Sequence, residues 1–573
     1  MTDAAASPDK ITGPTPDTAI RDAERADGPM VAADGRPLKQ SLNRALRRQK
    51  MRALALIAPL LLFILLTFLI PIGQMLFRSV ENQIVTDTLP RTVVSISDWD
   101  AAGGEPPSQE VFADFARDLT LAAEQRMHTR LGSRLNYEQP GISSLFRQAG
   151  RGMTDMGEEV MESLVAAEPA WEEAQTWVDL FGTPDWQAEN ADWLVLKDEG
   201  GMRFSIPPPE FEFRPEAREA LPRTADAFAD FELFSRVDDI ESVAEETPWP
   251  LVHVSLAEDL AANPGAVEAF DGETRARLEA VLPVAEAEMP FDYRAAFAEM
   301  DEDWLEVSFW ETLQTFSTPF TSGYFLTAAD RKLTADGVQM VPEDQRIYGT
   351  LFLRTMVMSL GITLSCILLG YPVAWLLANL PLRTANVLMI LVLLPFWTSL
   401  LVRTSAWKVL LQQQGVINDL LVWLNIISDA NRLVLINNQT GTIIAMTHIL
   451  LPFMILPLYS VMKTIPPSYL RAAKSLGATN WTAFWRVYFP QSVPGIGAGS
   501  ILVFILAIGY YITPEIVGGT RGVFISNRIA FHISTSLNWG LAAALGTILL
   551  ALVLVLYWLY DRIVGIDNVK LGG

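Results

Sequence analysis

Long apolar segments that are almost free of charge alternate with polar stretches along the chain. Six of them stand out, at residues 53–77, 350–378, 386–411, 441–462, 494–516 and 540–560. A helix needs ~20 apolar residues to cross a bilayer core of ~30 Å. In lipid the backbone must satisfy its own polar groups, which a helix does. The pattern therefore predicts an all-α integral membrane protein with six transmembrane helices.

Residues 81–348 follow a different pattern, in which short amphipathic stretches are broken by proline and polar runs. Helical periodicity recurs at 111–130 and 156–180, and three prolines stand together at 207–209. Eight of the sixteen tryptophans fall in this region, which supplies enough aromatic surface to bury a core. We expect a large, mainly helical domain inserted between helices 1 and 2.

These patterns divide the chain into five parts. They are a disordered cytoplasmic tail (1–38), a basic flank with transmembrane helix 1 (39–80), the insertion (81–348), a core with five transmembrane helices (349–565) and a cytoplasmic C-terminal tail (566–573). The first apolar segment is too long for the apolar region of a signal peptide, and no small-residue cleavage site follows it. We therefore expect it to be an uncleaved span.

The formal net charge of −23 combines two opposite populations. Residues 81–350 hold 54 acidic and 19 basic side chains, whereas the rest of the chain holds 12 acidic and 24 basic ones. Basic loops tend to stay on the cytoplasmic side of a membrane. With six spans, this rule places both termini in the cytoplasm and the acidic insertion outside. The acidic surface would repel phosphate, so no nucleic-acid partner is expected.

The loop between the fourth and fifth apolar segments carries the most informative motif. It reads RAAKSLGATNWTAFWRVYFP over residues 471–490, with Arg471, Ala472, Ala473, Gly477, Val487, Phe489 and Pro490 at its marked positions. This spacing resembles the EAA loop of the membrane subunits of binding-protein-dependent ABC importers, in which E-A-A, three residues and Gly precede nine residues and I-x-L-P. The resemblance implies a cytoplasmic helix-turn-helix that docks on an ATPase subunit. Arg471 stands where the family has Glu, so an ion pair made by that Glu is not expected here.

Two runs sharpen the resemblance, LPFWTSLLVRT at 394–404 and LLPFMILPLY at 450–459. They look like third- and fourth-span sequences of spermidine/putrescine-type permeases. The resemblance implies a multi-pass permease of the bacterial inner membrane, in contact with membrane lipid, that moves a small organic cation such as putrescine or spermidine. Its implied partners are two ATP-binding subunits, a second permease subunit and an extracytoplasmic substrate-binding protein. The chain itself would hold no cofactor, because ATP binds to the partner subunits.

Charged and aromatic residues near the broken parts of the spans are candidates for the translocation path. They are Trp397, Arg403, Trp407, Tyr510, Tyr511 and Glu515. Aromatic faces attract cations, and charges near spans are functional candidates. An aromatic belt at the membrane interface is the alternative for the aromatic residues. For Glu515 the alternative is an ion pair with Arg403 or Lys408.

Several motifs that other functions would require are absent from the sequence. The sequence contains no P-loop, no H-E-x-x-H motif, and only one cysteine, Cys366, so neither ATP binding, catalysis nor a metal site is expected. Two alternatives remain: a membrane-anchored sensor or enzyme that acts through the insertion, and a secondary transporter. The secondary transporter ranks last because we see no internal repeat and few titratable residues at mid-membrane. Gly495, Gly497 and Gly499 are expected to permit close helix packing, within the subunit or against a second permease.

Overall fold

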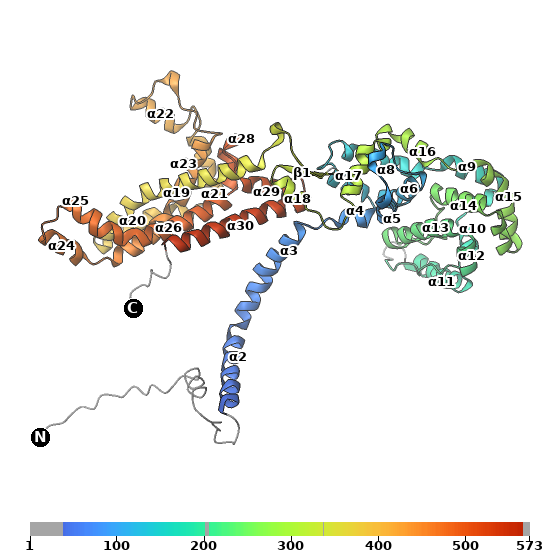
Figure 1. The fold of residues 1–573 in the computed structure, drawn as a ribbon, viewed down its shortest axis with the longest axis horizontal. Coiled ribbons are helices and arrows are strands. Elements are labelled where there is room, and N and C mark those ends of the chain that lie inside the picture. Colours follow the sequence, from blue (N-terminus) through green and yellow to red (C-terminus); the bar gives the residue numbers. More distant parts are fainter. Residues whose placement is uncertain (1–37, 201–204, 336, 565–573) are drawn as a thin grey trace. The chain divides into compact units, whose positions relative to one another are not determined.

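A computed structural model describes residues 38–200, 205–335 and 337–564 (Figure 1). The chain divides into two compact units, residues 1–77 and 78–573. The tails expected at 1–38 and 566–573 lie outside the described residues, apart from Leu38, which begins a helix.

The described part of the first unit is helical, with a basic start and an apolar remainder. It consists of α2 (Leu38–Ile64), a π-helical turn (Leu65–Leu69) and α3 (Ile70–Arg78), and Gln49–Arg78 is long and apolar enough to cross a membrane. Large apolar side chains along it, such as Leu56 and Phe63, are exposed to the surroundings. Such a surface is stable only against lipid or protein.

The described part of the second unit contains four further helices that could span a membrane. They are α19 (Tyr348–Asn379), α23 (Gln439–Thr464), the segment Asn480–Gly509 that ends in α26 (Phe489–Gly509), and α30 (Trp539–Val564). A bent pair raises the total from five to six if it counts as one span. A mainly helical membrane fold is thus confirmed, while the number of spans depends on this pair.

The apolar segment at 386–411, expected as one span, is a pair of helices with a sharp bend between them. It consists of α20 (Leu382–Leu393) and α21 (Leu400–Leu410), which meet at 93°. Pro395 lacks a backbone donor, and the side chain of Ser399 accepts a hydrogen bond from the Val402 N–H at the start of α21. The chain therefore stops one helix and starts another inside an apolar run.

The core is built on the packing of α23 between α19 and α26. Glycines allow the close approach: a Cβ on Gly499 would lie 2.6 Å from the sulfur of Met454, and one on Gly495 would lie 3.0 Å from Val461. These contacts are the close packing within the subunit that the glycine-rich start of the fifth segment predicts.

Short elements complete the core. They are α22 (Val416–Trp423), α24 (Pro467–Ser475), α25 (Asn480–Ala483), α27 (Ile512–Val517), α28 (Gly519–Gly522) and α29 (Ile525–Ser534). The fifth apolar segment, expected as one helix over 494–516, is interrupted between Gly509 and Ile512.

The insertion consists of short helices around one aromatic core, followed by a β-hairpin. Its helices are α4 (Gln83–Thr88), α5 (Pro90–Ser95), α6 (Gln109–Glu124), α7 (His128–Leu135), α8 (Ile142–Asp155), α9 (Glu158–Ala167), α10 (Ala174–Phe181), α11 (Pro184–Gly200), α12 (Pro215–Ala220), α13 (Pro222–Phe234), α14 (Pro250–Ala262), α15 (Gly272–Glu288), α16 (Tyr293–Met300), α17 (Val307–Thr315) and α18 (Gly323–Ala328). The hairpin pairs β1 (Arg331–Thr334) with β2 (Gly337–Met340) in antiparallel register.

One helix-capping arrangement occurs twice in the insertion. The sequence Leu-Pro-Arg-Thr begins both α5, at 89–92, and α13, at 221–224. In the first copy Asp118 of α6 accepts hydrogen bonds from the amide and the hydroxyl of Thr92, both at 2.8 Å. In the second copy Asp259 of α14 does the same for Thr224, at 2.8 and 2.7 Å.

A pair of tryptophans also recurs, with a matching separation. Trp171 and Trp177 follow the first Leu-Pro-Arg-Thr, and Trp304 and Trp310 follow the second, each within the pattern W-x-E-x-x-x-W-x-x-L. In each pair the second indole donates a hydrogen bond to the backbone carbonyl of the first, at 3.2 Å and 2.8 Å. The insertion therefore contains the same arrangement twice, an internal repeat that was not expected from the sequence.

The two copies exchange their tryptophan pairs. Trp310 of the second copy packs on Phe112 of α6 at a ring distance of 4.7 Å, and Trp177 of the first copy packs on His253 of α14 at 4.8 Å. Phe112 and His253 occupy equivalent positions, each six residues before the capping aspartate. The exchange produces two lobes, which we call lobe I (α5–α8 with α16 and α17) and lobe II (α9, α10 and α13–α15).

The difference between Phe112 and His253 makes a test of the lobe II core possible. His253 is fully buried between the carbonyls of Trp171 and Trp249, and burial lowers its pKa from 6.5 to about 4. Because the unfolded chain binds this proton more readily, stability is complete above pH 6.5 and is lost as the pH falls toward 4. The expected loss from this group is roughly 3 kcal/mol.

His253→Phe restores the residue that lobe I uses and removes the titrating group. We expect the acid-induced loss of stability between pH 6.5 and 4 to be smaller in this variant than in the wild type. Thermal unfolding of the purified chain in detergent, followed across that pH range, measures the difference. Equal pH dependence in both proteins would show that His253 does not control it.

Candidate functional site

The loop between α23 and α26 folds as a helix-turn-helix. The helices α24 and α25 are separated by a turn at Gly477, whose φ is +89°. The Ala478 amide donates to the Ala473 carbonyl, which closes the C-terminal end of α24, and the Thr479 side chain accepts from the Thr482 amide at the start of α25. The left-handed conformation explains why glycine stands at this position.

The residues of the predicted motif lie on α24, in the π-helical turn that follows α25, and at the start of α26. Arg471 and Ala472 are exposed on α24, and Ala473 is half-buried. Arg471 forms no ion pair within the described part of the chain. Val487 lies in a π-helical turn (Phe484–Tyr488), and Phe489 and Pro490 begin α26.

Large apolar side chains at the tip of the helix-turn-helix are exposed. Leu476 is 90% exposed and Trp481 is 72% exposed. Tyr469, on the first helix, is also exposed. Exposed aromatic and large aliphatic side chains grouped at one tip are typical of a surface that a protein partner covers.

The interruption of the fifth segment exposes backbone carbonyls that side chains of α29 satisfy. Ser526 donates to the Tyr510 carbonyl at 2.8 Å, and Asn527 donates to the Tyr511 carbonyl at 2.9 Å. Asn527 also donates to the Glu515 carboxylate at 2.6 Å and accepts from the Phe524 amide at 2.9 Å. The buried side-chain amide of Asn527 therefore links the Tyr511 carbonyl, the Glu515 carboxylate and the Phe524 amide.

This arrangement contradicts one alternative for Glu515. Its carboxylate is exposed and bonds to Asn527, and among the described residues no ion pair joins it to Arg403 or Lys408. The carboxylate thus remains open to the surroundings on one side.

The bent pair and the interrupted fifth segment lie against each other. The hydroxyls of Thr404 on α21 and Thr513 on α27 are 3.1 Å apart, and both side chains are fully buried. This contact brings the helix that carries Arg403 and Trp407 beside the helix that carries Glu515.

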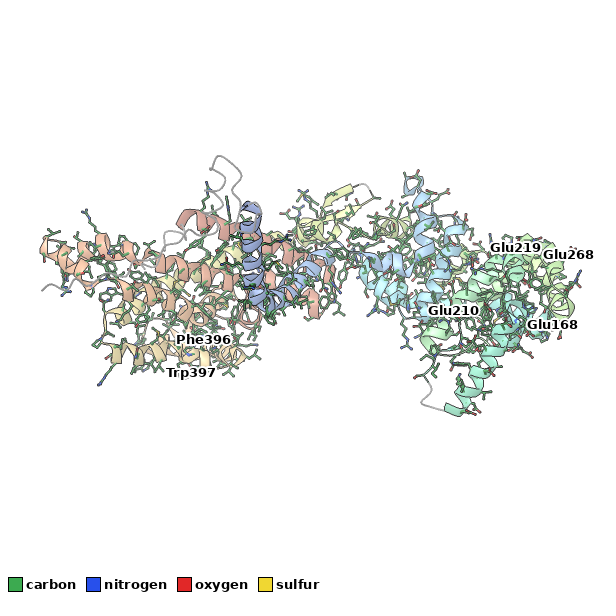
Figure 2. The ribbon with its side chains drawn as sticks, turned by 90° about the horizontal axis from the view of Figure 1, so that it is seen from below. Glu168, Glu210, Glu219, Glu268, Phe396 and Trp397 are labelled. Carbon is green, nitrogen blue, oxygen red and sulfur yellow. The ribbon has the colours of Figure 1, made fainter. Side chains whose placement is uncertain are left out.

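The other path candidates have distinct surroundings. Trp407 donates to His448 of α23 at 3.1 Å, so this histidine has a packing and hydrogen-bonding role. Two nitrogens of the Arg403 guanidinium, Nε and Nη1, are buried without a hydrogen-bond partner in the described residues, and the group lies 5.9 Å from the Phe396 ring. Trp397 is 74% exposed and lies next to Phe396 (Figure 2).

Sequence reasoning missed Asn527, Ser526 and the two threonines that join the broken segments. The available signal was the presence of polar side chains at or next to apolar runs, since such groups are kept only where they bond. Their partners are far away in sequence, so only the fold identifies them.

The role of Asn527 can be tested by removing its amide. Asn527→Ala leaves the Phe524 amide, the Tyr511 carbonyl and the Glu515 carboxylate without this partner. We expect a loss of roughly 2 kcal/mol in the free energy of unfolding. Asn431→Ala, at an exposed asparagine of the loop before α23, is the matched control. Thermal unfolding in detergent should distinguish the two variants, and equal melting temperatures would contradict the role.

Comparison with known proteins gives a consistent result. The family described as "Binding-protein-dependent transport system inner membrane component" matches residues 367–564. The spermidine/putrescine transport system permease protein PotB of Escherichia coli (strain K12) is 36% identical over 220 residues, which cover 38% of this chain and 79% of that protein. The inner membrane ABC transporter permease protein YdcU of the same organism is 32% identical over 225 residues, which cover 38% of this chain and 71% of that protein.

A solved structure of a bacterial alginate ABC transporter, in complex with an alginate pentasaccharide-bound periplasmic protein, also aligns. It covers 51% of this chain and 94% of that chain at 16% identity, with a TM-score of 0.35. A similarity at this level carries no argument about function. The relatives found by sequence are transport permeases, and none of them supports a membrane-anchored sensor or enzyme.

Proposed function

Because the chain belongs to the family of binding-protein-dependent transport system inner membrane components, we propose that it forms the translocation path for a small organic cation such as putrescine or spermidine. As an ABC importer permease of the inner membrane, it depends on ATP hydrolysed by other subunits. The uncovered tip of the helix-turn-helix, with Leu476 and Trp481, is the observation that carries the coupling part of this proposal.

The coupling surface would be the face around α24 and α25. An ATPase that covers Leu476 and Trp481 removes apolar area from water, which favours binding. Movement of the ATPase would reach α26 directly, because Val487, Phe489 and Pro490 lead from the loop into that helix. Two ATPase subunits, a second permease subunit and an extracytoplasmic binding protein complete the proposed assembly, with both termini in the cytoplasm.

The cationic substrate is supported by the names of the relatives and by charge. Glu515 offers an exposed carboxylate at the interrupted fifth segment, near the aromatic Tyr511. Arg403 works against free passage of a cation, since its guanidinium has no carboxylate partner in the described region. We infer that the cation passes on the Glu515 side of the α21–α27 contact.

A matched pair of tryptophans tests the coupling surface. Trp481 is 72% exposed on α25, and Trp423 is 75% exposed on α22, which the charge pattern places on the opposite side of the membrane. Trp481→Ala is expected to reduce the ATPase recovered with the tagged chain by about tenfold, whereas Trp423→Ala leaves it unchanged. Uptake of labelled putrescine by cells should fall in parallel for Trp481→Ala alone.

Recovery of no ATPase with the wild-type chain, even after mild crosslinking, would overturn the coupling proposal. Equal loss in both variants would show that exposed tryptophans act through general stability and not through docking. Normal ATPase recovery without putrescine or spermidine uptake would keep the importer function and remove the proposed substrate.

Gly477 provides a second, independent test of the loop. A Cβ at this position meets nothing within 4 Å, so Gly477→Ala adds no clash and acts only through the positive φ. The cost of that conformation is about 1 kcal/mol. We expect ATPase recovery to fall severalfold while the yield of folded protein stays the same. Gly73→Ala, where a Cβ is also free of neighbours and φ is not positive, should leave recovery unchanged.

A further inference from the structure

The loop between α21 and α23 exposes an apolar surface that neither the coupling loop nor the proposed path uses. On α22, Val416, Leu420 and Trp423 are each more than half exposed. Their separations of four and three residues place them on one side of the helix, which we call the apolar face of α22. Leu424 and Ile426, just beyond the helix, are exposed as well. A contiguous apolar surface of this kind marks an interaction site.

The opposite side of α22 is bonded to the rest of the loop. Asn418 is fully buried, and its side-chain nitrogen donates to the Gln412 carbonyl at 3.2 Å and to the Leu433 carbonyl at 2.9 Å. The side-chain oxygen of Asn418 accepts from the Leu433 amide at 2.9 Å. One asparagine thus joins the segments before and after the helix. The apolar face is therefore held outward, because turning it inward would break these three hydrogen bonds.

The charges of the loop neutralise one another. Residues 411–440 contain three charged side chains, Asp419, Asp429 and Arg432. Arg432 bonds to the Asp419 carboxylate at 2.7 Å and to the Asp429 carboxylate at 2.8 Å. An unpaired charge beside lipid is costly, and pairing lowers that cost. The loop therefore differs from the strongly acidic insertion, and it carries little free charge to orient a soluble protein partner.

The apolar face continues an exposed apolar surface of the helix before it. Leu401, Val402 and Val409 of α21 are exposed, and α22 follows α21 after one tight turn. In this turn the Gly415 amide donates to the Gln412 carbonyl at 2.9 Å, and a Cβ on Gly415 would lie 2.6 Å from the Val409 carbonyl oxygen. Figure 1 shows the loop with α22 standing out to one side of the long helices. It therefore extends sideways from the lipid-facing surface.

The length and chemistry of α22 fit the boundary between acyl chains and headgroups. Its eight residues span about 12 Å, which is too short to cross the bilayer core. Trp423 ends the helix, and tryptophan is enriched at this boundary because its ring is apolar and its N–H is polar. A short helix with one apolar side and a polar side lies in the plane of the membrane surface.

We propose that α22 lies in the membrane boundary opposite the coupling loop, with its apolar face among the upper acyl chains and the paired charges of Arg432 toward headgroups and water. The partner of this surface is the lipid bilayer itself. The loop is also bonded to the interrupted fifth segment, because the Asn437 amide donates to the Val517 carbonyl at 2.8 Å. Lipid contact would therefore hold the end of α21, the helix that carries Arg403 and Trp407, at a fixed depth.

Spin labelling of the full-length chain tests the proposal. Cys366→Ala removes the native thiol, and Leu420→Cys or Trp423→Cys then supplies a single labelling site. The chain is reconstituted in liposomes of equal parts phosphatidylethanolamine and phosphatidylglycerol. Collisions of the label with oxygen, which concentrates in lipid, are compared with collisions with a neutral nickel chelate, which stays in water. We expect the oxygen-to-nickel ratio at both sites to be severalfold higher than at a site in water, because both side chains lie among acyl chains.

Two reference sites calibrate this ratio in the same background. Leu61→Cys, at an exposed position of α2, gives the value in lipid, and Glu162→Cys, at an exposed position of α9, gives the value in water. With the label at Trp423→Cys, adding Leu420→Glu places a charge within the apolar face and should lower the ratio severalfold. Adding Gln414→Glu instead places the same charge at an exposed position before the helix and should leave the ratio unchanged.

Three results would overturn the proposal. The first is a ratio at both sites equal to the reference in water, and the second is an equal ratio in the Leu420→Glu and Gln414→Glu variants. The third is a low collision rate with both reagents, which would show that protein, in this preparation a second copy of the chain, covers the face. None of these results depends on an ATPase or a substrate, so the proposal stands or fails independently of the transport function.

Discussion

The membrane part of the structure depends on one requirement, that every backbone polar group freed from a helix must find another partner. Two apolar segments are broken, at residues 394–399 and at 510–511. The second break is held by Ser526 and Asn527, which take up the carbonyls of Tyr510 and Tyr511. In an environment without water this supply of donors decides where a helix can be interrupted.

The two breaks are also joined to each other, through the buried hydroxyls of Thr404 and Thr513. Regular helix on either side is stabilised by its own hydrogen bonds, whereas the broken segments rely on a few side chains. A small change in those contacts can therefore shift the broken segments without unfolding the helices that carry them. A gated path would require this property, and the proposed path residues Arg403, Trp407 and Glu515 lie on these neighbouring helices.

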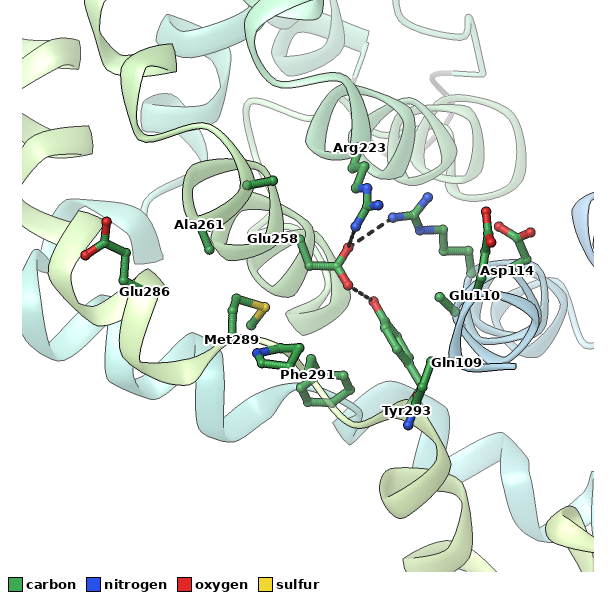
Figure 3. Close-up of a pocket in the computed structure, with 14 residues that line it drawn as sticks. Gln109, Glu110, Asp114, Arg223, Glu258, Ala261, Glu286, Met289, Phe291 and Tyr293 are labelled. Carbon is green, nitrogen blue, oxygen red and sulfur yellow. Dashed lines mark hydrogen bonds and ion pairs between the residues drawn. The ribbon is translucent and has the colours of Figure 1, made fainter. Parts of the chain in front are cut away.

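The insertion differs from the membrane part because it folds around a core of its own. It does so by using one arrangement twice: an aspartate caps a Leu-Pro-Arg-Thr helix, and a tryptophan pair closes the lobe. Exchange of the tryptophan pairs ties the two lobes together, so that neither copy completes its core alone. The same exchange produces the cleft between lobes, where Glu258 accepts from Arg117, Arg223 and Tyr293 (Figure 3).

Local sequence pattern was sufficient for the class of fold, the position of the apolar segments and the turn at Gly477, because hydropathy, helix period and a positive φ are properties of neighbouring residues. It also allowed the family resemblance, which the comparisons confirmed. It did not predict the 93° bend, because a proline in an apolar run permits either a kink or a break.

The repeated motifs are present in the sequence, but their equivalence is evident only from the structure, in which Thr92 and Thr224 bond to equivalent aspartates. What only the tertiary structure decided was which distant side chains meet: Asn527 with Tyr511, Thr404 with Thr513, and Glu258 with Arg117, Arg223 and Tyr293. Such pairings depend on how helices pack, and packing is set by the whole chain and not by any one segment.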